Sequence, residues 1–141
     1  MSAFTTREIE YLESQSMGRL ATVGPDGRPH IVPLTYRYNP DEDTIDLGGI
    51  DFANTKKWRD AQANPRATFL VDDFSPTAAH AVEVRGDAEI HETGGEAINP
   101  RFPQFVPQFI RLRPRRVVSW GLEEGTGLTE EGFRAASRGV G

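Results

Sequence analysis

The segment Gly24-Pro25-Asp26-Gly27 constrains the fold more than any other, because it places strong turn signals between two extended runs. Proline presets the backbone of a tight turn, and glycine accepts the positive φ that such a turn requires. The flanking runs are residues 18–23 and 30–38, so we expect an antiparallel hairpin. In the second run, alternation puts the following side chains on one face: Val32, Leu34, Tyr36 and Tyr38.

Pro33 interrupts the second of these runs. Proline has no N–H to donate to a strand ladder, so it belongs at a sheet edge or at a bulge. An interrupted ladder leaves neighbouring backbone groups free for a ligand. A plain edge strand explains Pro33 equally well, so this residue alone does not decide between the two interpretations.

The rest of the chain predicts further short strands and only two short helices. The helices are expected over residues 5–13 and about 54–63. The strands are expected over residues 44–48, 67–71, 79–85, 88–91 and about 109–119. Six or so strands without a β-α-β rhythm favour a mainly β fold, an antiparallel β-barrel with short helices.

Two segments lack a regular pattern. Residues 93–108 are rich in turn signals and aromatic residues, which predicts an irregular loop. We expect Phe102, Phe105 and Phe109 to anchor that loop on the core rather than to line a binding site. Residues 124–141 are expected to form a weak helix or a mobile tail. The predicted organisation is one domain over residues 1–123 followed by this tail.

Composition argues against several classes of function. No apolar run approaches the roughly 20 residues needed to span a bilayer, and the first residues lack a signal-peptide pattern, so we expect a cytoplasmic protein with no membrane partner. The net charge of −5 argues against a nucleic-acid binder. The four arginines of residues 111–116 fit a local anion patch or, as we prefer, the solvated face of a strand.

No group of side chains forms a catalytic or metal-binding constellation. The chain has no cysteine, and its histidines (His30, His80 and His91) are not at metal-ligand spacing, so no metal is expected. The acidic turn at residues 41–43 lacks the glycine and the distal glutamate of a calcium loop. No Gly-x-Ser-x-Gly motif is present. The catalytic residues are therefore unknown, and the chemistry can belong to a cofactor.

The segment Asn54-Thr55-Lys56-Lys57 opens the second predicted helix and indicates an anion site. A helix N-terminus already carries about half a positive charge, so lysines in its first turn are electrostatically misplaced. Free N–H groups, the hydroxyl of Thr55 and the two ammonium groups of Lys56 and Lys57 suit a phosphate. The sequence therefore predicts a nucleotide-like cofactor.

Three segments together resemble the pyridoxamine 5'-phosphate oxidase-like (PPOX) flavin/deazaflavin superfamily: residues 19–30, residues 54–59 with 64–67, and residues 115–122. The last segment is similar to the actinobacterial branch that uses coenzyme F420, a deazaflavin. The resemblance implies a split β-barrel of the FMN-binding-protein type. It also implies a homodimer that binds two cofactors in grooves between its subunits.

The resemblance further implies a set of cofactor-binding residues. Those near the phosphate are Thr55, Lys56 and Lys57. Those along the ring are Val32, Pro33 and Leu34 of the second hairpin strand. Those near the ring or its ribityl chain are Gly49 and Ile50.

The implied function is an F420-dependent oxidoreductase that transfers a hydride between the reduced deazaflavin and a conjugated organic small molecule. A polyketide or a quinone-like acceptor fits, because reductases of tetracycline pathways have similar sequences. An FMN-dependent oxidase or reductase of the same fold is the alternative, and a non-catalytic flavin or deazaflavin carrier or sensor is another. The roles of residues 100–108 and of the C-terminal tail stay open.

Overall fold

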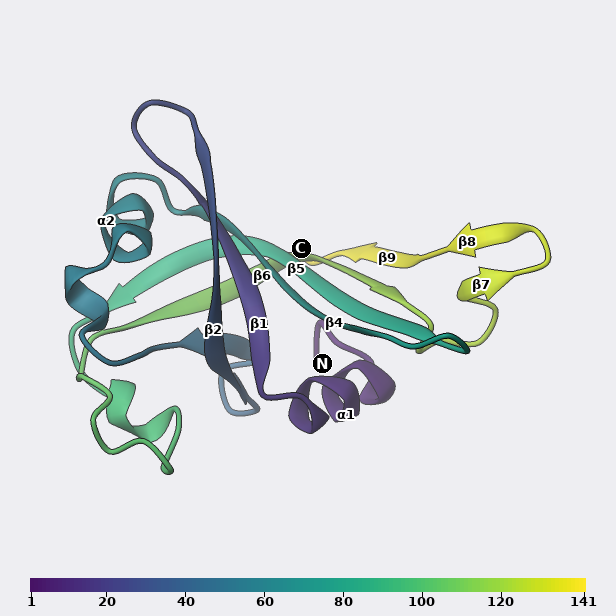
Figure 1. Ribbon diagram of the computed structural model, residues 1–141, viewed down its shortest axis with the longest axis horizontal. Helices are drawn as coiled ribbons and strands as arrows, with labels where there is room; N and C mark the ends of the chain where they lie inside the picture. Colours follow the sequence, from purple (N-terminus) through teal and green to yellow (C-terminus); the bar gives the residue numbers. More distant parts are fainter.

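The computed structural model describes residues 1–141 and has the mainly β architecture that the sequence predicts. Six antiparallel strands follow one another in the order β3-β2-β1-β4-β5-β6, and pairing of β3 with β6 closes them into a barrel (Figure 1). The barrel strands are β1 (Met17–Val23), β2 (Pro29–Asn39), β3 (Thr44–Leu47), β4 (Arg66–Phe74), β5 (Ala79–His91) and β6 (Phe109–Trp120).

The hairpin of β1 and β2 forms where its turn residues predict. Gly27 has a φ of 79°, the positive value that glycine permits. The pairing of Met17 with Thr35 and of Val23 with Pro29 fixes the register. This register directs the side chains of Leu20 and Leu34 into the core.

Strand β5 is one continuous strand, whereas the sequence predicted two strands over residues 79–85 and 88–91. The register between β5 and β6 shifts between Arg85 and Gly86. A β-carbon on Gly86 would lie 2.2 Å from the carbonyl oxygen of Arg113. Gly86 therefore lets β6 approach at a bulge, and bulges of this kind bend strands in barrels. The predicted interruption was wrong because the glycine marks a bend inside the strand.

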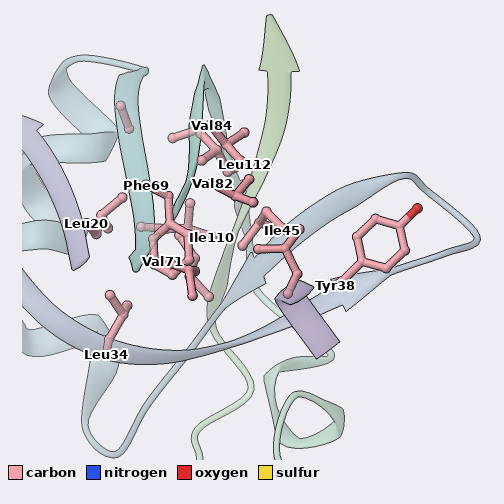
Figure 2. Packing of buried hydrophobic residues seen from close by; sticks show 14 of the residues in the cluster. Leu20, Leu34, Tyr38, Ile45, Phe69, Val71, Val82, Val84, Ile110 and Leu112 are labelled. Carbon is pink, nitrogen blue, oxygen red and sulfur yellow. The ribbon is translucent and has the colours of Figure 1, made fainter. Parts of the chain in front are cut away.

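Alternate side chains of the strands fill the barrel with a core of aliphatic and aromatic residues. Figure 2 shows side chains from several strands meeting inside the barrel: Leu20, Leu34, Phe69, Val71, Val82, Val84, Ile110 and Leu112. Helix α1 (Thr6–Ser14) adds Tyr11 and Leu12 to the same core. Because side chains alternate along a strand, the burial of these residues in one cluster directs the intervening side chains to the outer face of the barrel, where a ligand can reach them.

The C-terminal segment differs from the expected weak helix. Strands β7 (Gly127–Thr129) and β8 (Gly132–Arg134) form a hairpin that projects from the barrel, and β9 (Ala136–Gly139) returns to pair with β6 (Figure 1). Strand β6 pairs with β3 only through residues 110–112, so residues 116–119 offer β9 a free edge. Strands therefore stand in place of the expected weak helix. Mobility of the tail and the domain division at residue 123 stay predictions.

Helix α2 (Lys56–Ala63) and the loop between β5 and β6 lie at the end of the barrel away from the β7–β8 hairpin (Figure 1). The 3-10 helix η1 (Phe52–Asn54) precedes α2, and the 3-10 helix η2 (Gly95–Ala97) is the one helical turn of the loop. The loop is otherwise irregular, as its prolines predict. None of the helices has the length and apolar character that crossing a membrane requires.

Candidate functional site

A pocket of about 310 Å³ lies at the end of the barrel that carries α2. Strands β1 and β2, the bend after β3, the start of α2 and the β5–β6 loop all contribute to its wall. The lining residues are Met17, Pro33, Leu34, Thr35, Gly48, Gly49, Ile50, Phe52, Lys57, Phe102 and Phe105. The structure thus brings together Pro33, Leu34, Gly49, Ile50 and Lys57 of the predicted site, whereas Val32, Thr55 and Lys56 do not line the pocket.

Two larger pockets contain none of the predicted site residues. One of about 390 Å³ is lined by Arg66, Arg85 and Arg115 among others, and one of about 470 Å³ lies beside α1. Small-molecule sites are mostly apolar with a few placed polar groups. Six of the eleven residues lining the 310 Å³ pocket are hydrophobic, against three of eleven and two of nine in the others. We therefore take the 310 Å³ pocket as the candidate site.

Lys57 is the only ionisable residue among those that line the pocket. Its Nζ lies over the ring of Phe52, 5.1 Å from the centroid, at a distance that allows a cation–π interaction. Burial lowers the pKa of Lys57, and no carboxylate pairs with its ammonium group. A half-buried cation without an anionic partner in its own chain is suited to an anionic ligand.

Lys56 has a different environment from its neighbour. Its Nζ lies 3.0 and 3.1 Å from the two carboxylate oxygens of Asp60, one helical turn later. Asp60 is buried and also accepts a hydrogen bond from Thr22 Oγ1 at 3.1 Å. Burial alone opposes the ionisation of Asp60, but these hydrogen bonds outweigh it and lower the pKa of its carboxyl group. Lys56 thus neutralises a buried carboxylate of its own helix, and its expected contact with the anion stays a prediction.

Thr55 is the N-cap of α2. Its Oγ1 accepts a hydrogen bond from the backbone N–H of Trp58 at 3.4 Å and donates one to the carbonyl oxygen of Phe52 at 2.7 Å. These two bonds fix how the chain enters the helix. The N-cap therefore sets the direction in which the side chains of the first turn, including that of Lys57, project from the helix.

Pro33 lies on a part of β2 that has a strand on only one side. β2 pairs with β1 from Pro29 to Thr35, whereas its pairing with β3 begins at Tyr36. The expectation of a sheet edge is confirmed, and Pro33 and Thr35 line the pocket along this edge. No strand pairs with the outward-facing N–H and C=O groups of this stretch, so these groups can form hydrogen bonds with the polar edge of a ligand.

The loop residue Phe102 lines the pocket, whereas the sequence predicts that it anchors the loop on the core. Phe105 and Phe109 are buried with Ile98 in a separate cluster, as expected of anchoring residues. Phe102 is 43% exposed and lines the pocket, and the buried Phe105 lines it as well. The signal was present in the density of proline and phenylalanine at residues 100–108, but spacing alone does not say which ring points outward.

The three histidines lie outside the pocket. His80 lies 3.3 Å from Asp73, and His91 stacks on Phe109 with ring centroids 4.8 Å apart. The structure contains no group of three or more histidine, aspartate and glutamate side chains that could hold a metal ion. The pocket lining contains no acid–base pair of side chains.

Comparisons with known proteins identify a family and relatives that this chain resembles. The profile of the family described as pyridoxamine 5'-phosphate oxidase matches residues 5–125, which include every residue of the pocket. A Streptomyces rimosus protein named 5a,11a-dehydrotetracycline/5a,11a-dehydrooxytetracycline reductase is 41% identical over 123 residues. That alignment covers 85% of this chain and 84% of the reductase.

Solved structures of similar fold come from several bacteria. A conserved hypothetical protein of Mycobacterium tuberculosis superposes with a TM-score of 0.67 at 25% identity, covering 85% of this chain and 86% of its own. A protein of Mycobacterium smegmatis described as FAD binding has a TM-score of 0.61 at 21% identity, covering 84% of this chain and 96% of its own. The barrel architecture is thus shared across these proteins.

Proposed function

Because the chain belongs to the pyridoxamine 5'-phosphate oxidase family, we propose that it is a reductase that binds coenzyme F420 in the pocket lined by Pro33 and Lys57. A hydride from the reduced deazaflavin would pass to a conjugated organic small molecule. The name of the 41% identical relative, a reductase, supports an oxidoreductase of this fold. A polyketide-like acceptor is consistent with the name of that relative.

The observation that carries the proposal is the unpaired ammonium group of Lys57 in a pocket that is otherwise uncharged. A cofactor phosphate supplies the anion that this cation lacks. Lys57 is the phosphate anchor in this proposal, and Thr55 and Lys56 support it indirectly. Thr55 caps the helix, and Lys56 holds Asp60 beside it.

The remaining walls fit the ring of such a cofactor. The edge of β2 at Pro33 and Thr35 presents backbone groups to a polar ring edge, and Leu34, Gly49 and Ile50 present apolar surface. When bound, the reduced deazaflavin supplies the hydride, and water supplies the proton that completes reduction of the acceptor. The role of the protein is to orient the ring and to exclude water from the hydride.

We propose that the working form is a homodimer in the cytoplasm. Small-molecule pockets measure about 300–1,000 Å³, so a pocket of about 310 Å³ holds a ring system but not a whole coenzyme. The side chains of Met17 and Ile50 at the pocket are 48% and 59% exposed. A second copy of the chain would cover these side chains and supply the missing wall.

An FMN-dependent reductase is the alternative, because FMN also presents a phosphate to Lys57 and a similar fold occurs in a protein described as FAD binding. Separate titrations with oxidised F420 and with FMN, followed by ligand fluorescence, distinguish the two. The proposal predicts that F420 binds more tightly by about tenfold or more. It also predicts reduction of 5a,11a-dehydrotetracycline with reduced F420. Tighter binding of FMN would favour the alternative, and binding of neither would contradict both.

A further inference from the structure

The loop between β5 and β6 presents an exposed aromatic ring to the pocket. Phe102 lines the pocket and is 43% exposed, and Ile50, which also lines it, is 59% exposed. Isolated exposed apolar side chains are common on protein surfaces. Two that border the same pocket form an apolar surface of the kind that a ligand covers.

The ring of Phe102 is supported from behind. Phe105 stacks almost parallel to it, with centroids 6.1 Å apart and an interplanar angle of 16°. Phe105 is only 6% exposed and is buried with Ile98 and Phe109. The N–H of Phe102 donates to the carbonyl of Asn99 at 3.0 Å, and the N–H of Phe105 donates to the carbonyl of Phe102 at 3.1 Å. The position of the exposed ring is therefore fixed by packing and by backbone hydrogen bonds.

The loop is also bonded directly to the part of the pocket that follows β3. The N–H of Val106 donates to the carbonyl oxygen of Gly49 at 3.2 Å. Ile98 packs so closely on Gly48 that a β-carbon there would lie 2.8 Å from Ile98 Cδ1. The loop is thus a built wall of the pocket rather than a free flap.

We propose that Phe102, backed by Phe105, is the surface on which a flat fused-ring acceptor stacks, so that this loop selects planar conjugated substrates. The proposal rests on the proposed function, because acceptor and cofactor share the pocket. An aromatic face favours a flat π-system over a saturated ring of similar size. A pre-positioned ring loses little conformational freedom on binding, which increases that preference.

Calorimetric titration with two monoanionic probes tests the proposal. Anthraquinone-2-sulfonate is flat, whereas adamantane-1-carboxylate is not. Because both carry one negative charge, a difference between them in their response to Phe102→Ala does not come from their charge attraction to Lys57. Both are titrated into the F420-loaded and the free protein, for the wild type and for Phe102→Ala, Phe102→Trp and Phe74→Ala. Phe74 is 78% exposed at the end of β4 and does not line the pocket, so its variant is the matched control.

We expect Phe102→Ala to weaken binding of the flat probe by about tenfold. Phe102→Trp should keep it, Phe74→Ala should not change it, and the saturated probe should respond by less than about twofold. An equal loss for both probes, or no loss for the flat one, would overturn the proposal.

Failure of the stacking wall and failure of the proposed function give different results. If F420 does not bind but Phe102→Ala still weakens binding of the flat probe selectively, the proposed function is wrong and the stacking role of Phe102 is supported. If F420 binds to the wild type and Phe102→Ala weakens binding of F420 but not of the flat probe, the stacking role of Phe102 is wrong and the proposed function is supported.

Discussion

Arg138 of the last strand forms an ion pair with Glu8 of α1, whose side chain is completely buried. The same carboxylate accepts hydrogen bonds from Ser119 Oγ at 2.5 Å and from the N–H of Thr5 at 2.9 Å. Arg138 Nε also donates to the carbonyl oxygen of Ala3 at 2.9 Å. One arginine near the C-terminus therefore connects the N-terminal segment, the first helix and the last strand.

Substitution of Arg138→Met should destabilise the protein by about 3 kcal/mol, because it leaves the buried carboxylate of Glu8 without its cation. We expect the lower end of the usual range because the Arg138 side chain keeps 33% of its surface exposed. Urea unfolding measures the change. The control is Arg134→Met, which removes an exposed pair with Glu131 and should cost less than about 1 kcal/mol.

The double variant Glu8→Gln with Arg138→Met removes both charges and should be more stable than Arg138→Met alone. Equal losses for Arg138→Met and Arg134→Met would contradict this account of β9. So would a double variant no more stable than the single one.

Asp60 should make stability depend on pH in the acid range. Hydrogen bonds from Lys56 and Thr22 together outweigh burial and hold the pKa of the Asp60 carboxyl below its usual range. The pKa of an aspartate in the unfolded chain is about 3.9. The ionised form therefore contributes stability above that pH, and the contribution is lost as pH falls through the folded pKa. Asp60→Asn should be less stable at neutral pH and should lose less stability on acidification.

Thermal unfolding from about pH 7 to pH 2 checks this expectation against the wild type and against Asp41→Asn. Asp41 is exposed in a turn, so its variant controls for the loss of one carboxylate. Parallel stability curves for Asp60→Asn and the wild type would show that the Asp60 carboxylate does not carry the pH dependence.

Gly86 is expected to tolerate no side chain. Alanine at this position would bring a methyl group to 2.2 Å from the carbonyl oxygen of Arg113 and should destabilise the barrel by about 1–3 kcal/mol. Gly49→Ala is the matched control, because its methyl group would meet Phe52 at an ordinary 3.5 Å. Urea midpoints compare the two, and equal stability of both variants would contradict the bulge as the reason for the glycine.

Local sequence predicted the elements whose formation depends on neighbouring residues. The turn ending at Gly27 and the edge position of Pro33 follow from backbone restrictions within one hairpin. The start of α2 follows from its cap, Thr55. These features follow from residues close together in the chain, so they can be predicted from the local sequence.

Features that depend on distant contacts were not predictable in the same way. Strand β9 has no apolar alternation, and its place depends on a free edge of β6 and on the pair between Arg138 and Glu8. The outward position of Phe102 depends on Phe105 filling the core beneath it. The pairing of Lys56 with Asp60 had a local signal, since opposite charges four residues apart meet on a helix.

Fluorescence titration of F420 into Lys57→Ala, beside the wild type and Lys57→Arg, tests whether Lys57 anchors the cofactor phosphate. Loss of one charge-assisted hydrogen bond of about 1.5–3 kcal/mol predicts an affinity about 10 to 150 times weaker. Thermal stability should fall only slightly, because Lys57 has no carboxylate partner in the chain and its cation–π contact with Phe52 is worth about 0.5–1 kcal/mol. Lys57→Arg should keep most of the affinity. Equal affinity of F420 for the wild type and for Lys57→Ala would contradict Lys57 as the phosphate anchor.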